Sequence, residues 1–198
     1  MRSAAVSTRP LAAALWAAEG RTAAATRAVL LAVLGSLLLW ASAKVQVPFW
    51  PVPMTMQTYV VLVLGAAYGW RLGTATVLLY LAQGALGLPV FAGTPERGLG
   101  LAYMSGPTGG YLAGFVLAAA VTGWLAERGW TRSWGLTLVA MAIGHAVIFV
   151  PGIGWMSALF GFDKAVALGL APFWAATLLK TLLAGFTLPL AWRCLSRA

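Results

Sequence analysis

The segment Ala171-Pro-Phe-Trp-Ala-Ala-Thr-Leu-Leu-Lys180-Thr-Leu-Leu-Ala-Gly-Phe-Thr-Leu-Pro-Leu-Ala-Trp192 carries a single charge, that of Lys180. It is long enough to cross a bilayer, because a membrane-spanning helix needs about 20 predominantly apolar residues. A lysine near the centre of such a helix costs roughly 2.5–3.5 kcal/mol on insertion scales. Lys180 lies about nine residues, or roughly 13 Å of helix rise, from one end. The segment therefore predicts a membrane helix in which Lys180 faces a cavity or a ligand, with snorkelling to an interface as the alternative.

The whole chain has the composition of a membrane protein. Of its 198 residues, 61% are hydrophobic and only 9% are charged, whereas a soluble domain carries about 25% charged residues. The mean hydropathy is +0.87. We predict an all-α integral membrane protein with six transmembrane helices, over the apolar stretches Ala28–Ala43, Met54–Gly69, Leu72–Gly87, Thr108–Ala126, Ser133–Pro151 and Ala171–Trp192.

The net charge of +9 is distributed unevenly between the two sides that these helices define. One side carries Arg2, Arg9, Arg21, Arg27, Arg71, Arg128, Arg132, Arg193 and Arg197. The other side carries Lys44, Arg97 and Lys164. Loops rich in Lys and Arg stay in the cytoplasm, so both termini are predicted to be cytoplasmic. The basic charge is explained by topology, and no nucleic-acid partner is expected.

The predicted helices divide the chain into two parts. Residues 1–26 are predicted to be a cytosolic N-terminal tail, and residues 27–198 a membrane-embedded, substrate-binding domain of six helices. The three outer connections, Val45–Pro53, Leu88–Pro107 and Gly152–Leu170, are long and rich in Pro, Gly and aromatic residues. Long ordered loops over one end of a bundle are typical of binding sites. They predict a lid over a substrate pocket near the outer face.

Small residues recur at four-residue spacing in the first apolar stretch, at Ala28, Ala32 and Ser36. Small residues with this spacing let another helix approach closely. Docking of a partner chain and packing inside the protein are both compatible with this row.

Catalysis finds little support in the sequence. The single histidine, His145, lies among apolar residues, and the acidic residues are scattered over Glu19, Glu96, Glu127 and Asp163. Metal ligands come in clusters, so no metal, no cofactor and no enzyme activity is predicted. Two alternatives to a binding function remain: an intramembrane hydrolase centred on His145 with Ser157 as a candidate nucleophile, and a structural scaffold subunit.

A second group of residues predicts recognition of a small molecule. Cationic, neutral polar and aromatic side chains together suit a small, partly apolar anion with an amide-like head. The predicted substrate-binding residues are Gln83, Arg97, Thr177, Lys180, Trp50 and Tyr111. Thr177 and Lys180 are three residues apart and share one helix face.

Three motifs carry a resemblance to a known family. They are Pro51-Val-Pro-Met-Thr-Met-Gln57-Thr58, Tyr80-Leu-Ala-Gln-Gly-Ala-Leu-Gly-Leu-Pro-Val-Phe91-Ala-Gly93 and Gly106-Pro-Thr-Gly-Gly-Tyr111-Leu-Ala-Gly114. Together, over roughly residues 28–192, the chain resembles the BioY family, the biotin-binding S components of energy-coupling-factor (ECF) transporters. The resemblance implies a six-helix fold, high-affinity uptake of biotin as the transported ligand, and location in the bacterial cytoplasmic membrane.

The resemblance also implies partners and site residues. The partners would be an ECF transmembrane coupling subunit and cytosolic ATPase subunits, besides membrane lipid. Gln83 falls at a polar pocket position of the family, Arg97 at a basic position of the outer loop, and Lys180 at a lysine of the last helix. Thr177 stands where the family typically has an aspartate. Lys180 therefore lacks the acidic neighbour that the family pattern would supply.

Overall fold

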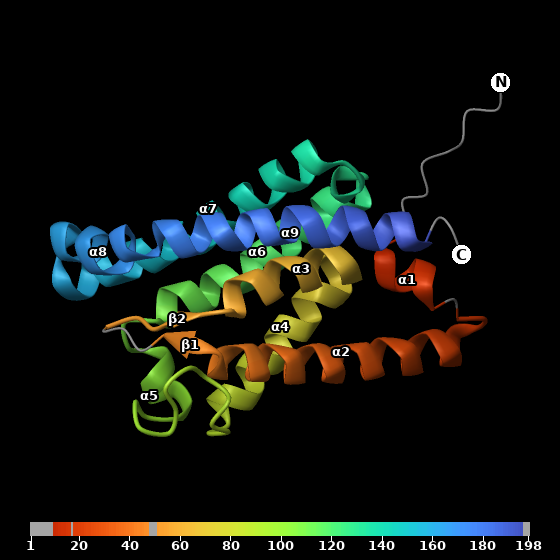
Figure 1. Cartoon of the computed structure of the whole chain (residues 1–198). Coiled ribbons are helices and arrows are strands. Elements are labelled where there is room, and N and C mark those ends of the chain that lie inside the picture. Colours follow the sequence, from red (N-terminus) through yellow and green to blue (C-terminus); the bar gives the residue numbers. More distant parts are fainter. Residues whose placement is uncertain (1–9, 17, 48–50, 196–198) are drawn as a thin grey trace.

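The computed structural model describes residues 10–16, 18–47 and 51–195 as a bundle of helices with one small β-hairpin (Figure 1). The long helices are α2 (Arg21–Lys44), α3 (Gln57–Tyr68), α4 (Trp70–Ala85), α6 (Gly109–Glu127), α7 (Trp134–Phe160) and α9 (Trp174–Leu195). Shorter elements connect them: α1 (Leu11–Leu15), β1 (Gln46–Val47), β2 (Met54–Thr55), α5 (Gly100–Met104), η1 (Trp130–Arg132), α8 (Phe162–Gly169) and η2 (Ala171–Phe173).

Each of the six predicted apolar stretches overlaps one of the long helices, which confirms an all-helical membrane protein with several apolar spans. In the described part of the chain, 4 helical segments are long and apolar enough to cross a membrane by themselves: α2, α6, α7 and the segment Phe162–Leu195. The α3 and α4 helices are shorter and form a hairpin around Gly69. Its φ of +81° suits glycine, which has no Cβ to clash there. Because α3 and α4 do not meet this length, the number of six membrane spans remains a prediction.

The α6 helix lies at the centre of the bundle, against α3, α4 and α7. Its residues Gly114, Ala118 and Thr122 are all buried. A Cβ on Gly114 would lie 2.8 Å from the backbone oxygen of Ile148 in α7. At the contact between α3 and α6, a Cβ on Gly65 of α3 would lie 2.6 Å from the backbone oxygen of Ala119 of α6. Backbone-to-backbone approach of this kind needs small residues at the interface.

The small-residue row of α2 is turned partly inward. Ser36 is fully buried and accepts a hydrogen bond from Gln83 of α4 at 3.3 Å. The neighbouring Gly35 packs against Tyr68 and Thr76, while Ala28 and Ala32 are half-buried. Ser36 thus packs inside the protein in this structure and presents no surface to a partner chain.

The predicted end of the fifth helix at Pro151 is wrong. The α7 helix continues through Pro151 to Phe160, and α8 then turns back, so most of the predicted loop Gly152–Leu170 is helical. Proline is tolerated inside membrane helices because neighbouring helices accommodate the freed backbone groups. Here Gly110 and Gly114 of α6 lie against Pro151 and let the two helices stay close together.

Two short elements are present in addition to the six predicted helices. Within the first outer connection, β1 and β2 pair antiparallel, with Gln46 opposite Thr55 and Val47 opposite Met54. Within the predicted N-terminal tail, α1 packs on α3 and α9, and α2 already begins at Arg21. Figure 1 shows the hairpin, α5 and α8 at one end of the bundle, and α1, the start of α2 and the last turns of α9 at the other.

Candidate functional site

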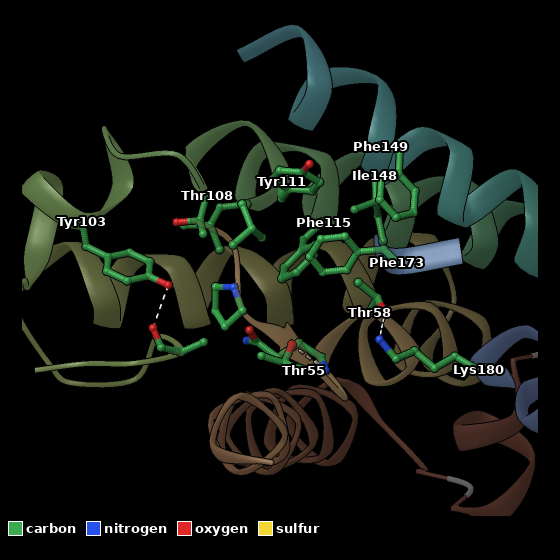
Figure 2. Close-up of a pocket in the computed structure, with 15 residues that line it drawn as sticks. Thr55, Thr58, Tyr103, Thr108, Tyr111, Phe115, Ile148, Phe149, Phe173 and Lys180 are labelled. Carbon is green, nitrogen blue, oxygen red and sulfur yellow. Dashed lines mark hydrogen bonds between the residues drawn. The ribbon is translucent and has the colours of Figure 1, made fainter. Parts of the chain in front are cut away.

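One cavity lies among the hairpin, the outer loop, the first turns of α3 and α6, the middle of α7, η2 and Lys180 of α9 (Figure 2). Its volume is about 50 Å³, which is room for a few water molecules. Its lining combines polar side chains with aromatic and aliphatic ones: Val52, Pro53, Thr55, Gln57, Thr58, Ala92, Tyr103, Thr108, Tyr111, Leu112, Phe115, Ile148, Phe149, Phe173 and Lys180. Figure 2 shows Lys180 and Tyr103 at opposite ends, with Phe115 and Phe173 between them.

Lys180 supplies the charge of this cavity. Its side chain is only 8% exposed, and Nζ donates a hydrogen bond to Thr58 Oγ1 at 3.2 Å. Thr58 stands in the first turn of α3, so this bond joins α9 to α3. Among the described residues, this neutral hydroxyl is the one acceptor that the ammonium has. A buried cation without an opposite charge is costly, and an anionic ligand group would compensate it.

A chain of polar groups lies beside the lysine. Gln57 Nε2 donates to the hydroxyl of Tyr80 at 2.6 Å, and that hydroxyl donates to the backbone oxygen of Val90 at 2.9 Å. Gln57 and Tyr80 are both buried. Because Val90 belongs to the outer loop between α4 and α5, the chain connects the cavity wall with this loop. Buried polar networks that are satisfied in this way fix the geometry of a site.

Aromatic rings form the apolar part of the wall. Phe149 meets Tyr111 edge-on at a centroid distance of 6.0 Å and Phe173 at 6.3 Å. The Tyr111 hydroxyl donates to the backbone oxygen of Gly169 at 2.8 Å, which ties α6 to the end of α8. A Cβ on Gly152 would lie 2.5 Å from the Tyr111 ring. Glycine at 152 therefore lets the Tyr111 ring pack close to the backbone of α7.

The end of the cavity opposite Lys180 leads towards Arg97. Tyr103 and Thr108 line the main cavity and also a neighbouring one of about 70 Å³, which Arg97 and Pro51 share. Arg97 Nη1 donates to the backbone oxygen of Pro51 at 3.2 Å. Burial raises the pKa of Tyr103, so its hydroxyl keeps its proton and donates to the backbone oxygen of Ala92 at 2.9 Å. The site thus has a cation at each end.

The structure brings together only part of the predicted set. Lys180 and Tyr111 line the main cavity, and Arg97 lines the adjoining one. Gln83 lies outside this lining, bonded to Ser36 and beside a surface groove with Trp40. Thr177 is half-buried and also stands outside it. Trp50 falls outside the described residues.

Sequence reasoning missed several lining residues, above all Gln57, Thr58, Tyr103 and Thr108. Two of them, Gln57 and Thr58, close the first quoted motif, and Thr108 lies in the third. Polar residues at helix starts beside the outer loops were the signal that could have found them.

The geometry of His145 does not support a hydrolase. His145 Nδ1 lies 3.0 Å from the backbone oxygen of Met141 and 3.1 Å from Thr181 Oγ1. The hydroxyl of Ser157 donates to the backbone oxygen of Ile153 at 2.7 Å. Both residues stand on α7, and twelve residues of helix separate them by about 18 Å. They cannot act as a base and a nucleophile on one substrate atom.

Lys44 holds the outer loop in place. At the end of α2, its Nζ donates to the backbone oxygens of Phe91 and Thr94, each at 3.1 Å, and to Thr94 Oγ1 at 3.2 Å. The ring of Phe91 stacks on Tyr103 with centroids 4.8 Å apart. Lys44 therefore fixes the position of a wall of the cavity without lining it.

We expect Lys44→Met to loosen this loop and to speed ligand release from the cavity by about tenfold, because hydrogen bonds from a charged donor contribute about 1.5–3 kcal/mol each. Dissociation of a labelled ligand from purified protein measures the effect. Lys164→Met is the matched control, since Lys164 is an exposed cation at the same end of the bundle. Equal release rates in the two variants would contradict a positioning role for Lys44.

The apolar spans define a multi-pass, all-helical membrane protein. The sequence profile of the BioY family matches residues 13–197, so the chain belongs to the BioY family.

Individual relatives agree with this assignment. A protein of Pyrococcus horikoshii named "Probable biotin transporter BioY" is 37% identical over 138 residues, covering 70% of this chain and 79% of the relative. A Thermotoga maritima protein named "Biotin transporter BioY" is 35% identical over 159 residues, covering 80% and 91%. Both are named as transporters. The prediction that the chain is no enzyme agrees with these names.

A solved structure shares the fold. The crystal structure of the S-component for biotin from an ECF-type ABC transporter matches with a TM-score of 0.75 at 21% identity, over 88% of this chain and 95% of that chain. At this identity, the likeness concerns the fold.

Proposed function

We propose that this protein binds biotin with high affinity and carries it across the cytoplasmic membrane as the substrate-specific component of an ECF transporter. The observation that carries the proposal is Lys180, a buried cation at the end of an aromatic-walled cavity. Proteins with at least 35% identity to this chain are named biotin transporters. The family has both bacterial and archaeal members, and the proposed location is the cytoplasmic membrane of the cell.

The chemistry of biotin matches the lining. Biotin has a carboxylate at the end of an aliphatic chain, an apolar sulfur-containing ring and a ureido group with two N–H donors and one carbonyl acceptor. We propose that Lys180 binds the carboxylate, because its one protein acceptor is the neutral Thr58 hydroxyl. Tyr111, Phe149 and Phe173 would pack on the apolar body. The ureido group would then lie at the end formed by Tyr103 and Thr108, next to Arg97.

The remaining predicted residues have smaller roles in this proposal. Thr177, three residues before Lys180 on α9, and Gln83, which bonds to Ser36 of α2, would act on the site through neighbouring side chains. A contribution of Trp50 from the outer loop stays a proposal based on sequence alone.

Binding would require the outer end of the bundle to open. Pockets for molecules of this size usually enclose about 300–1,000 Å³, whereas the cavity measures about 50 Å³. Apart from Phe173 of η2, the parts of the lining outside the long helices belong to the hairpin and to the outer loop up to the start of α6. We propose that they move outward to admit biotin and close again over it.

The orientation and the partners follow from the charges and the family. Of the described cations, the arginines at 21, 27, 71, 128, 132 and 193 lie towards the end of the bundle that holds α1, and Lys44, Arg97 and Lys164 lie at the opposite end. By the positive-inside rule we propose six spans in residues 27–198, with both termini cytoplasmic and the cavity near the outer face. Lys180-Thr181 is not part of the phosphate-binding pattern G-x-x-x-x-G-K-[ST], because leucine and not glycine stands before the lysine. The energy for transport would therefore come from a coupling subunit with cytosolic ATPases. Ala28 and Ala32 of α2 are proposed docking residues.

Equilibrium binding of radiolabelled biotin to the purified protein in detergent tests the function. We expect saturable binding at one site per chain, displaced by unlabelled biotin and not by lipoate, an acid of similar size without the ureido group. Absence of saturable binding by folded protein would overturn the proposal. His145→Ala is expected to keep full binding, since His145 does not line the cavity.

A further inference from the structure

A second cavity, separate from the first, lies on the outside of the bundle between α4 and α6. It is an open groove of about 460 Å³, lined by Trp70, Ala120, Val121 and Trp124. Trp70 is 41% exposed and Trp124 is 47% exposed. The groove shares no lining residue with the Lys180 cavity. Its floor is apolar, and it faces outward from helices whose outer surfaces would contact lipid.

The geometry of the groove is fixed by a close contact between the two helices at its mouth. A Cβ on Gly123 would collide with the backbone nitrogen of Trp70, so the backbones touch at this point. The carboxylate of Glu127 accepts a hydrogen bond from the Trp70 backbone N–H at 3.2 Å. These contacts hold the last turn of α6 against the first turn of α4. They bring Arg71 and Arg128 to the same end of the groove.

Both arginines lie against the tryptophans of the groove. The guanidinium carbon of Arg71 lies 5.2 Å from the centroid of the Trp70 ring, and that of Arg128 lies 3.3 Å from the Trp124 ring. Arg128 Nη1 also donates to the backbone oxygen of Trp124 at 3.2 Å. Within the described ranges, the Arg71 guanidinium has no hydrogen-bond acceptor. Stacking on an aromatic ring orients an arginine while leaving its N–H groups available.

The charge balance at this mouth is positive. Glu127 is the acid beside the two arginines, and one of its oxygens is engaged with the start of α4. One negative and two positive charges leave an excess of one positive charge. Arginine binds phosphate in a bidentate manner, and tryptophan is enriched where a membrane meets water. A polar, cationic rim over an apolar groove fits an anionic amphiphile.

We propose that this groove binds an anionic phospholipid, with an acyl chain lying along Trp70, Ala120, Val121 and Trp124 and the phosphate held by Arg71 and Arg128. A free phosphate ion would use the arginines but would leave the groove uncovered. The arginine-rich end of the bundle is the one that the positive-inside rule assigns to the cytoplasm, and the cytoplasmic leaflet supplies anionic lipid. The proposal goes beyond biotin binding and does not depend on it.

Native mass spectrometry and thermal unfolding of the detergent-purified protein test this proposal together. Phosphatidylglycerol is titrated against phosphatidylcholine with the same acyl chains, and against inorganic phosphate. We expect one retained phosphatidylglycerol molecule and a higher unfolding midpoint, with at least about fivefold weaker binding of phosphatidylcholine. Inorganic phosphate is expected to give no shift. A full shift with phosphate alone would overturn the assignment to a lipid.

The matched variants are Arg71→Gln, Arg128→Gln and Arg21→Gln. Each removes one cation from the same end of the bundle, but Arg21 is exposed at the start of α2 and does not line the groove. We expect about tenfold weaker phosphatidylglycerol binding in the first two and no change in Arg21→Gln. Arg71→Lys is expected to restore part of the affinity, because the charge returns without the bidentate geometry. Equal losses in all three Gln variants would show a diffuse charge effect and would refute the site.

Discussion

Lys180→Met is expected to weaken biotin binding by about 100-fold or more while the protein remains folded. Removing one partner of a buried, hydrogen-bonded charge pair costs about 2–5 kcal/mol of binding free energy, and each 1.4 kcal/mol is a factor of about ten in Kd. Lys180 is 8% exposed, and its protein acceptor is the neutral hydroxyl of Thr58. In the complex, the biotin carboxylate would be its opposite charge.

The same substitution is not expected to destabilise the ligand-free protein. Methionine has nearly the length of lysine and carries no charge, and replacing buried charged groups by apolar ones is often neutral or stabilising. We therefore expect an unchanged or higher unfolding midpoint for Lys180→Met without biotin. Isothermal titration and thermal unfolding on the same preparations separate loss of a contact from loss of the fold.

Biotin methyl ester provides the control for the orientation of the ligand. The ester lacks the negative charge, so the wild-type protein should bind it much more weakly than biotin, and Lys180→Met should bind the two compounds about equally. Thr177→Asp, which places an acid three residues before the lysine, is expected to weaken binding of biotin, because the new carboxylate competes for Lys180. If Lys180→Met still preferred biotin over its ester by the wild-type ratio, the carboxylate would lie elsewhere.

Gly65→Val is expected to lower the unfolding midpoint by about 10 °C or more. A Cβ at this position would lie 2.5 Å from Thr122 Oγ1, 2.6 Å from the backbone oxygen of Ala119 and 2.9 Å from its Cα. On the other side, a Cβ on Gly73 would lie 2.8 Å from the Cα of Gly65. The backbones of α3, α4 and α6 meet here, and a backbone cannot turn aside as a side chain can. Overpacking costs about 1–3 kcal/mol or more, and about 3 kcal/mol corresponds to roughly 10 °C in a chain of this size.

Gly135→Val is the matched control for this prediction. Gly135 also lies in a helix, α7, but a Cβ there would meet nothing within 4 Å. Thermal unfolding of the two variants in the same detergent, followed by intrinsic fluorescence, measures the difference. Equal midpoints would show that α3 and α6 are not in close contact at Gly65.

The sequence predicted where the helices lie better than it predicted which side of each helix faces the cavity. Apolar stretches located the long helices because length and hydropathy suffice for that purpose. Two boundaries failed for local reasons. Pro151 reads as a helix end in water, but α7 continues past it where Gly110 and Gly114 give it room. The two-residue strands β1 and β2 are too short for their alternation to be recognised.

The site was harder to predict because a membrane helix is apolar on every side. In a soluble protein, a polar residue such as Gln83 would mark either the surface or a site, and periodicity would distinguish them. Here Gln83 of α4 turns towards Ser36 of α2, whereas Gln57, on the preceding helix α3, turns towards Tyr80 and the cavity. Lys180 could be singled out from the sequence because the cost of a lysine inside a membrane helix does not depend on which way that helix is rotated, and its side chain is buried in the structure.

The closest approaches among α3, α4 and α6 are made by glycines outside the cavity lining. The close approaches at Gly65, Gly73 and Gly123 join α3, α4 and α6, and none of these glycines lines the cavity. Changes in the aromatic wall can therefore accumulate over evolution without separating the helices. A scaffold of this kind can acquire specificity for a new solute through a handful of substitutions near the hairpin and outer loop, while the inner framework is inherited unchanged.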